Sequence, residues 1–589
     1  MAVSFWKAVA WNDCLEDKGL VEVDPDPDLL WLALALYARR SEGTELRLVI
    51  AIRDQARKTR LETRFELLPS AFLQLQLETS SSTSLDLAIS WYQSCCTNHS
   101  LCNRVEGQKH EWMPSRLIDI GEMESQWKLV DVRLDNITPA PYFTLSYRWG
   151  LNQSLVLQNS TFYTFRREQP ISDLPQTFKD AIHVIRRFSV RYLWIDALCI
   201  IQDNREDRER EIPEMQRIYN RSACTLAASA SEDPNGGLFR RRDPQALVPG
   251  TIAAPSAALR NENYHIFDNS YWDRHAINGP LHKRGWVFQE RLLSPRVIYF
   301  GKSQISWECF TELKCEGFPY GIPKLNSVKK LDPLWEFQEP GHQPMQQRGK
   351  MPIHLLRLWN SLVREYSNCK LTEASDKLPA FAGISELFRE VTGDQYICGM
   401  WRSSLLEQLN WWVDQPRPRV STDYRAPSWS WASLDGPIRP HHQAARNESL
   451  VSILAVKSRY NHVDSAGILY HEIRLLGSLI SSTELERPLQ AVLYPDTLEV
   501  NLGLLGTFYF LPLQTASYEL FSGGTGHRDL AFHTEVYCLL LEVMLCTLPI
   551  TFRRVGHCIL DGEDVFKLGL SIKENGLADI RDAVNITII

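Results

Sequence analysis

Residues 142–147 read YFTLSY, residues 192–195 read YLWI and residues 223–230 read ACTLAASA. Each run is short and apolar, and each is bounded by polar residues, which is typical of a strand buried inside a sheet. Residues 173–188 and 206–220 lie between the runs, and their apolar residues recur at helical spacing. This alternation of strand and helix predicts a parallel sheet with right-handed crossovers.

The chain outside this α/β region is expected to fold into further parts. Residues 354–366 and 377–391 show helical spacing, whereas residues 331–352 are polar and rich in Pro, Gln and Gly, as linkers are. After Pro427 the pattern changes to short strands separated by turns. We therefore predict five parts: an N-terminal extension (1–135), a central α/β domain (136–315), a linker (316–352), a helical segment (353–425) and a β-rich C-terminal domain (426–589).

Composition excludes several classes of protein. The chain has 589 residues, of which 44% are hydrophobic and 23% charged, so it is neither disordered nor a coiled coil. A net charge of −7 gives no basic surface for nucleic acid. We find no signal peptide and no apolar stretch that would span a bilayer, and we therefore expect a cytoplasmic protein. Thirteen scattered cysteines, an odd number, predict free thiols rather than a disulfide framework.

A ligand site is expected at the carboxyl ends of the three parallel strands, where open sheets bind their ligands. The segments that follow these strands are residues 146–150, 196–203 and 229–235. No phosphate-binding loop, GxGxxG motif or GxSxG elbow accompanies them, which argues against common nucleotide-binding and esterase sites. The predicted substrate-binding residues are Ser146, Arg148, Trp149, Gly150 and Asp196.

Several residues in this region also have a plainer interpretation. Trp149 could be a core residue and Gly150 a turn residue, and Asp196 could cap the turn that follows its strand. An acidic residue early in a helix, such as Glu211, is usually a solvated partner of the helix dipole.

A short cluster of Cys96, His99 and Cys102 suggests three zinc ligands, with Cys95 or a distant residue as the fourth. The paired CxxC spacing of common zinc sites is absent. We therefore favour a half-buried helix end over a metal site, and the prediction for metal ligands is none.

Three long blocks carry a family resemblance. Residues 142–150 (YFTLSYRWG), residues 174–228 and residues 284–294 (RGWVFQERLLS) resemble the fungal heterokaryon incompatibility (HET) domain. The resemblance covers roughly residues 140–310. One departure is Arg208, which stands where the family usually has a Trp.

The resemblance implies a role in non-self recognition after hyphal fusion, ending in programmed cell death. It also implies an α/β fold similar to Toll/interleukin-1 receptor (TIR) domains, many of which cleave NAD with a glutamate on a helix. The helix after the second strand is the natural place for such a glutamate, and Glu211 fits the position where HET family members often carry Glu or Gln. The implied activity is therefore NAD glycohydrolase, with Glu211 as the catalytic residue and NAD as a consumed substrate rather than a cofactor.

Two alternatives remain open at this point. The domain could act without catalysis, by forming a homo-oligomer or by binding an incompatibility partner protein. The chain could also have been recruited to another fungal pathway.

Overall fold

The protein, seen here as a computed structural model, divides into two compact units. The first holds Met1–Glu214, Ile218–His282 and Ser294–Lys329, and the second holds Met215–Arg217, Lys283–Leu293 and Lys330–Ile589. The structure describes residues 31–39, 45–54, 59–69, 75–103, 112–121, 123, 125–150, 155–247, 251–253, 263–268, 271–322, 329, 331, 333–334, 349–418, 424–440, 446–460, 469–482, 491–500, 508–521, 530–544, 550–561 and 583–589.

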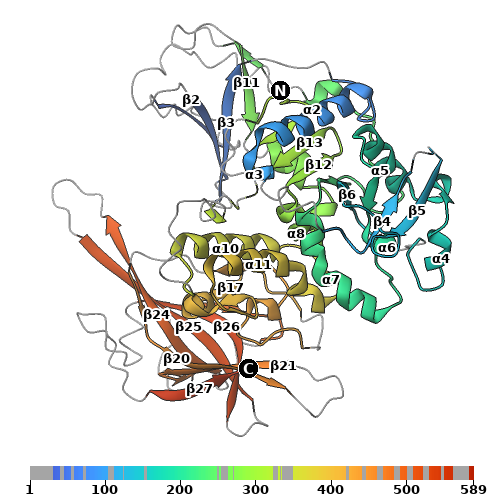
Figure 1. The fold of residues 1–589 in the computed structure, drawn as a ribbon. Coiled ribbons are helices and arrows are strands. Elements are labelled where there is room, and N and C mark those ends of the chain that lie inside the picture. The colour runs from blue at the N-terminus through green and yellow to red at the C-terminus, as the bar shows by residue number, and fades with distance from the viewer. Residues whose placement is uncertain are drawn as a thin grey trace. The chain divides into compact units, whose positions relative to one another are not determined.

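A nine-stranded mixed sheet forms the centre of the first unit (Figure 1). Strand β6 pairs in parallel with β8 on one side and β9 on the other, and β12 pairs in parallel with β9. Antiparallel strands flank this parallel core on both sides. The sheet order is β14 (Leu313–Cys315), β13 (Ile305–Cys309), β12 (Arg296–Phe300), β9 (Cys224–Ala227), β6 (Tyr142–Ser146), β8 (Tyr192–Trp194), β4 (Arg116–Asp119), β5 (Gln126–Asp131) and β7 (Gln169–Pro170).

The three strands predicted from the apolar runs are confirmed as parallel neighbours. Every residue of β6, β8 and β9 is buried, as expected for strands that are covered on both faces. The mixed α/β class is therefore confirmed. Residues 116–131, which precede the predicted central domain, supply β4 and β5 to the same sheet; the predicted domain boundaries themselves stay a prediction.

Side-chain contacts place two helices on opposite faces of the sheet. On one face, Phe143 contacts Phe188 at the end of α5 (Gln176–Arg187), and Tyr147 contacts Phe178 within it. On the other face, Trp194 contacts Tyr219 of α7 (Arg205–Asn220). The chain runs from β6 through α5 to β8 on one side, and then through α7 to β9 on the other side of β6. Because these two connections run in opposite directions along the sheet, right-handed crossovers place α5 and α7 on opposite faces.

The first unit also contains a long helix, a short helix and a second sheet. Helix α2 (Ser82–Asn98) packs against α5 and β13 through a stripe of buried residues, and α3 (Ser100–Asn103) follows at once. The second sheet is antiparallel, with the strand order β1 (Trp31–Arg39), β2 (Glu45–Asp54), β3 (Thr59–Pro69), β11 (Asn263–Asp268) and β10 (Thr251–Ala253).

The second unit combines helices with a sheet that is antiparallel except for the parallel pair β26 and β27. Helices α8 (Gly285–Leu293), α10 (Ile353–Tyr366) and α11 (Ala382–Thr392) surround an aromatic core in which Trp359 contacts Phe381, Phe388 and Trp401. Two predicted helical segments, 354–366 and 377–391, overlap α10 and α11.

The C-terminal sheet confirms the predicted change to β-structure after Pro427. Its main order is β19 (Arg446–Ser449), β24 (Phe508–Phe521), β25 (Leu530–Met544), β26 (Thr551–Asp561), β27 (Val584–Ile588), β21 (Leu469–Gly477) and β20 (Ser452–Tyr460). Val536, Cys538 and Leu540 alternate along β25 and join one apolar cluster with Cys558 and Leu560 of β26. The intervening Tyr537, Leu539 and Leu541 are buried as well, so this stretch of β25 is covered on both faces. Within the described part of the chain, no helix is long and apolar enough to cross a membrane.

Candidate functional site

The topology of the sheet creates a switch point at β6. The chain leaves β6 for β8 on one side and later returns to β9 on the other side. The carboxyl ends of these parallel strands therefore share one edge of the sheet, where the connections diverge to opposite faces. Ligands of open α/β sheets bind in the crevice outside such an edge.

The loops that follow the three strands contact each other at this edge. Trp149, after β6, donates its indole Nε1–H to Asp196 Oδ2, after β8, at 2.6 Å. Arg148 forms an ion pair with Glu232, which lies after β9. Gly150 has φ +73°, and a Cβ at this position would lie 2.8 Å from the Cβ of Asp233. The convergence predicted for these loops is therefore present in the structure.

Asp196 is fixed by its own turn as well as by Trp149. It opens the short helix α6 (Asp196–Cys199), where its Oδ1 accepts the backbone N–H of Ala197 at 2.7 Å. The expected capping role and the contact to the neighbouring loop thus coexist in one buried carboxylate. Ser146, the last residue of β6, is also buried. Tyr142 donates its hydroxyl to Ile218 O of α7, and because side chains alternate along a strand, Ser146 lies on the same face of the sheet as Tyr142.

Helix α7 carries a buried charge cluster next to these loops. Glu211 is 2% exposed, and its carboxylate lies 3.7 Å from Arg116 Nη2 and 3.3 Å from Arg210 Nε. Asp207, one turn earlier, bonds Arg116 Nη2 at 2.5 Å and accepts the backbone N–H of Ile201. Arg116 is 4% exposed and also donates its Nε–H to Cys199 O at 2.6 Å. Two buried carboxylates thus share one buried guanidinium.

Asp196 in the loop after β8 and Arg116 and Glu211 of the α7 cluster all affect the pKa of the Cys199 thiol. Burial raises the pKa of the Cys199 thiol to about 12, the Arg116 charge opposes this shift, and the Asp196 and Glu211 charges add to it. The charges of Asp196 and Glu211 thus both act on this buried thiol, against the charge of Arg116.

The burial of Glu211 corrects the interpretation of this residue as a solvated partner of the helix dipole. The helix turns so that Asp207, Glu211, Met215 and Ile218 are buried together. Their spacing of four, four and three residues is the helical stripe, and it is the signal that would have revealed the two buried carboxylates from sequence. Arg208, the departure from the family pattern, lies on the exposed side. Sequence reasoning missed Arg116 because β4 joins this sheet from outside the strand–helix pattern.

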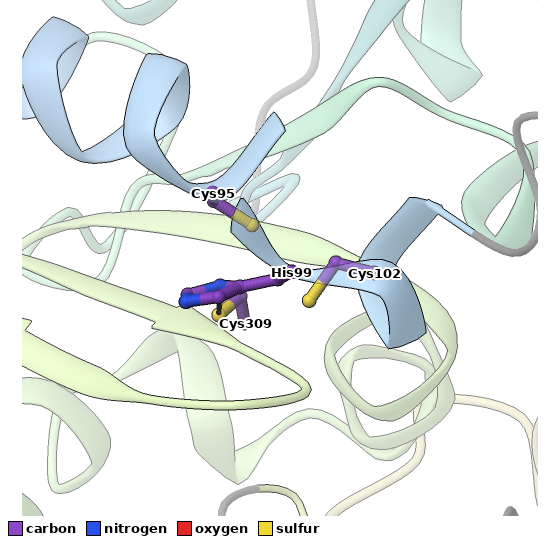
Figure 2. Close-up of side chains that lie close together, drawn as sticks. All are labelled: Cys95, His99, Cys102 and Cys309. Carbon is purple, nitrogen blue, oxygen red and sulfur yellow. Dashed lines mark hydrogen bonds between the residues drawn. The ribbon is translucent and has the colours of Figure 1, made fainter. Parts of the chain in front are cut away.

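A second group of side chains differs from the cluster that the sequence suggested. Figure 2 shows Cys95, His99, Cys102 and Cys309 turned toward one another, and all their candidate ligand atoms lie within 4.8 Å of one another. Cys96 is not part of this group. The buried stripe of α2 contains Cys95 and leaves Cys96 half-buried, because consecutive residues of a helix face different directions.

Comparison with known families identifies the central region. Residues 142–290 match the model of the heterokaryon incompatibility protein (HET) family, and the chain is therefore a protein with a HET domain. This implies a function related to heterokaryon incompatibility. No curated protein and no solved structure is detectably similar to the chain.

Proposed function

We propose that this protein is an effector of non-self recognition whose HET domain cleaves NAD at the nicotinamide–ribose bond, and that the resulting loss of NAD leads to programmed cell death. The observation that supports this proposal is the bond from Trp149 to Asp196, which joins two strand-end loops at the switch point of the sheet. The same layout, a parallel core with helices on both faces, supports a TIR-like fold for this domain.

The residues at the strand ends suit the binding of a dinucleotide. The bond to Asp196 fixes the orientation of the Trp149 indole, and an oriented indole can stack on a nicotinamide or adenine ring. Arg148 is paired with Glu232, whose side chain is 73% exposed. Such a surface ion pair contributes little, so the guanidinium can exchange this carboxylate for a diphosphate oxygen.

Glu211 is the proposed catalytic carboxylate. In the reaction the bond between C1′ of the ribose and the nicotinamide nitrogen breaks, and its electron pair leaves with nicotinamide. Water then adds to the oxocarbenium-like carbon, and the products are ADP-ribose, nicotinamide and a proton. A carboxylate beside the ribose stabilises the positive charge that develops on the sugar.

Incubation of the purified full-length protein with NAD tests this function. We expect nicotinamide and ADP-ribose to appear in equal amounts. Chromatography of the reaction mixture measures both products. NAD that stays intact with a folded protein contradicts the proposed chemistry.

A specific observation favours a second, non-catalytic function. Arg116 and Arg210 already hold the carboxylates of Asp207 and Glu211, as expected for a cluster that stabilises the domain. In this alternative the HET domain signals by self-association or by binding an incompatibility partner protein. Cell killing that persists without NAD loss would support it.

A further inference from the structure

The four side chains of Figure 2 form a set of metal ligands drawn from two distant parts of the chain. Cys95 lies near the end of α2, His99 follows this helix, and Cys102 belongs to α3. Cys309 is the last residue of β13, 210 residues after His99. We propose that Cys95, His99, Cys102 and Cys309 bind one zinc ion, which fastens helices α2 and α3 to the central sheet.

The distances fit a tetrahedral zinc site. Zn–S bonds of about 2.3 Å and Zn–N bonds of about 2.0 Å place neighbouring ligand atoms roughly 3.5–3.8 Å apart. His99 Nδ1 lies 3.5 Å from Cys309 Sγ, and the four candidate ligand atoms lie within 4.8 Å of one another. Closing the group around an ion therefore needs movements of about 1 Å or less.

The ligand types select the metal. Three sulfurs and one imidazole suit zinc, whereas Mg²⁺, Ca²⁺ and Mn²⁺ prefer oxygen ligands. All four positions of the tetrahedron would be filled by protein side chains, which characterises structural rather than catalytic zinc. Cys95, Cys102 and Cys309 have exposures of 0%, so bulk water does not reach the sulfurs.

The surroundings supply the hydrogen bonds that zinc-bound thiolates accept. The turn between β13 and β14 directs the backbone N–H groups of Thr311 and Glu312 at Cys309 Sγ, each at 3.4 Å. The hydroxyl of Thr311 lies 3.6 Å from Cys102 Sγ. These contacts orient the sulfurs and disperse their charge.

Charge balance supports the same assignment. Three thiolates and Zn²⁺ sum to a net charge of −1 in a buried place. Arg296 has an exposure of 0%, and its guanidinium donates to Cys95 Sγ at 3.2 Å as well as to Ala223 O and Asn103 Oδ1. A buried cation is stabilised by an adjacent anion, and the zinc–thiolate centre would provide one.

The histidine is also oriented for metal binding. With Nδ1 turned toward Cys309, its Nε2 lies 3.8 Å from a carboxylate oxygen of Glu312, which in turn pairs with Lys314. A carboxylate behind the ligating imidazole fixes the ring and raises its basicity. Glu312 is therefore a positioning residue for the site.

Metal analysis of the full-length protein, purified without chelators, tests the proposal. We expect about one zinc per chain in the wild type and in Cys96→Ser, because the Cys96 thiol is outside the group, and a loss of most of this zinc in Cys309→Ser. Zinc absent from the wild type, iron in its place, equal loss in the two variants, or zinc retained by Cys309→Ser would each overturn the assignment.

A second measurement on the wild type keeps the proposal testable if Cys309→Ser does not fold. The protein is stripped of metal under reducing conditions and titrated with Co²⁺ alone. We expect intense visible bands of tetrahedral cobalt–thiolate that saturate at about one equivalent and disappear when Zn²⁺ is added. Weak bands typical of octahedral cobalt, or a disulfide among Cys95, Cys102 and Cys309 in the protein as purified, would overturn the proposal.

Discussion

The indole of Trp149 donates to the carboxylate of Asp196 across the gap between two parallel strands. This bond holds together the loops after β6 and β8, and it saturates one oxygen of a buried carboxylate. Trp149→Phe keeps an aromatic ring but removes the donor. We expect the free energy of unfolding in urea to fall by about 1–2 kcal/mol.

Tyr163→Phe is the control for this substitution, because the Tyr163 side chain is 77% exposed. It should change the stability by less than about 0.5 kcal/mol. If Trp149→Phe behaves like this control, the bond to Asp196 does not stabilise the loops.

The two arginines of the α7 cluster should differ strongly in their contribution to stability. Arg116→Met leaves Asp207 and Glu211 buried without their buried cation, and we expect a loss of about 3–5 kcal/mol. Arg210→Ala removes a side chain that is 61% exposed. The loss of its ion pairs with the same carboxylates should therefore lower the free energy of unfolding by less than about 1 kcal/mol. Equal losses in chemical denaturation would show that the cluster is not buried as described.

A buried lysine predicts how stability depends on pH. Burial lowers the pKa of Lys377 to about 8, although Asp435 lies 4.0 Å away, whereas the ordinary pKa is 10.5. Between these values the unfolded chain binds more protons than the folded chain, so the free energy of unfolding should rise with pH, by at most about 1.4 kcal/mol per unit.

Lys377→Met removes this contribution. The stability of the wild type relative to Lys377→Met should therefore increase between about pH 8 and about pH 10. Denaturation curves of the two proteins across this range provide the measurement. Parallel pH profiles would mean that Lys377 keeps an ordinary pKa in the folded protein.

Thiol labelling should separate buried from accessible cysteines. Burial raises the pKa of Cys199 to about 12, so only about one in ten thousand of these thiols is ionised near pH 8. Cys96 is only half-buried. Alkylation of the folded protein followed by peptide mass spectrometry should modify Cys96 well before Cys199, and the reverse order would contradict the fold around α6.

The local sequence predicted the parallel core because each strand is a short apolar run between helical patterns. It could not predict that residues 116–119 form β4 beside β8, since strand order is set by contacts between distant segments. The group around Cys309 could not be predicted for the same reason. Three of its members lie within eight residues, but the fourth is brought in by β13, far along the chain.

The candidate site was predictable to a similar extent. Sequence indicated the loops that contain Trp149 and Asp196, since strands of one parallel sheet end at one edge. It did not reveal the bond between these residues, nor that Arg116 would be the buried partner of Glu211. These partners depend on which side of α7 faces the sheet. The spacing of Asp207 and Glu211 indicates that side only if both carboxylates are taken to be buried.

Release of nicotinamide from NAD by the wild type, Glu211→Gln and Glu209→Gln tests the central claim most directly. Glu209 lies on the same helix, but its side chain is 62% exposed and pairs with Arg205. We predict turnover by the wild type and Glu209→Gln, and a rate lower on the order of a hundredfold, about 3 kcal/mol, for Glu211→Gln with its fold intact by circular dichroism. Equal rates for the two variants, or no nicotinamide from any of the three proteins, would contradict the account.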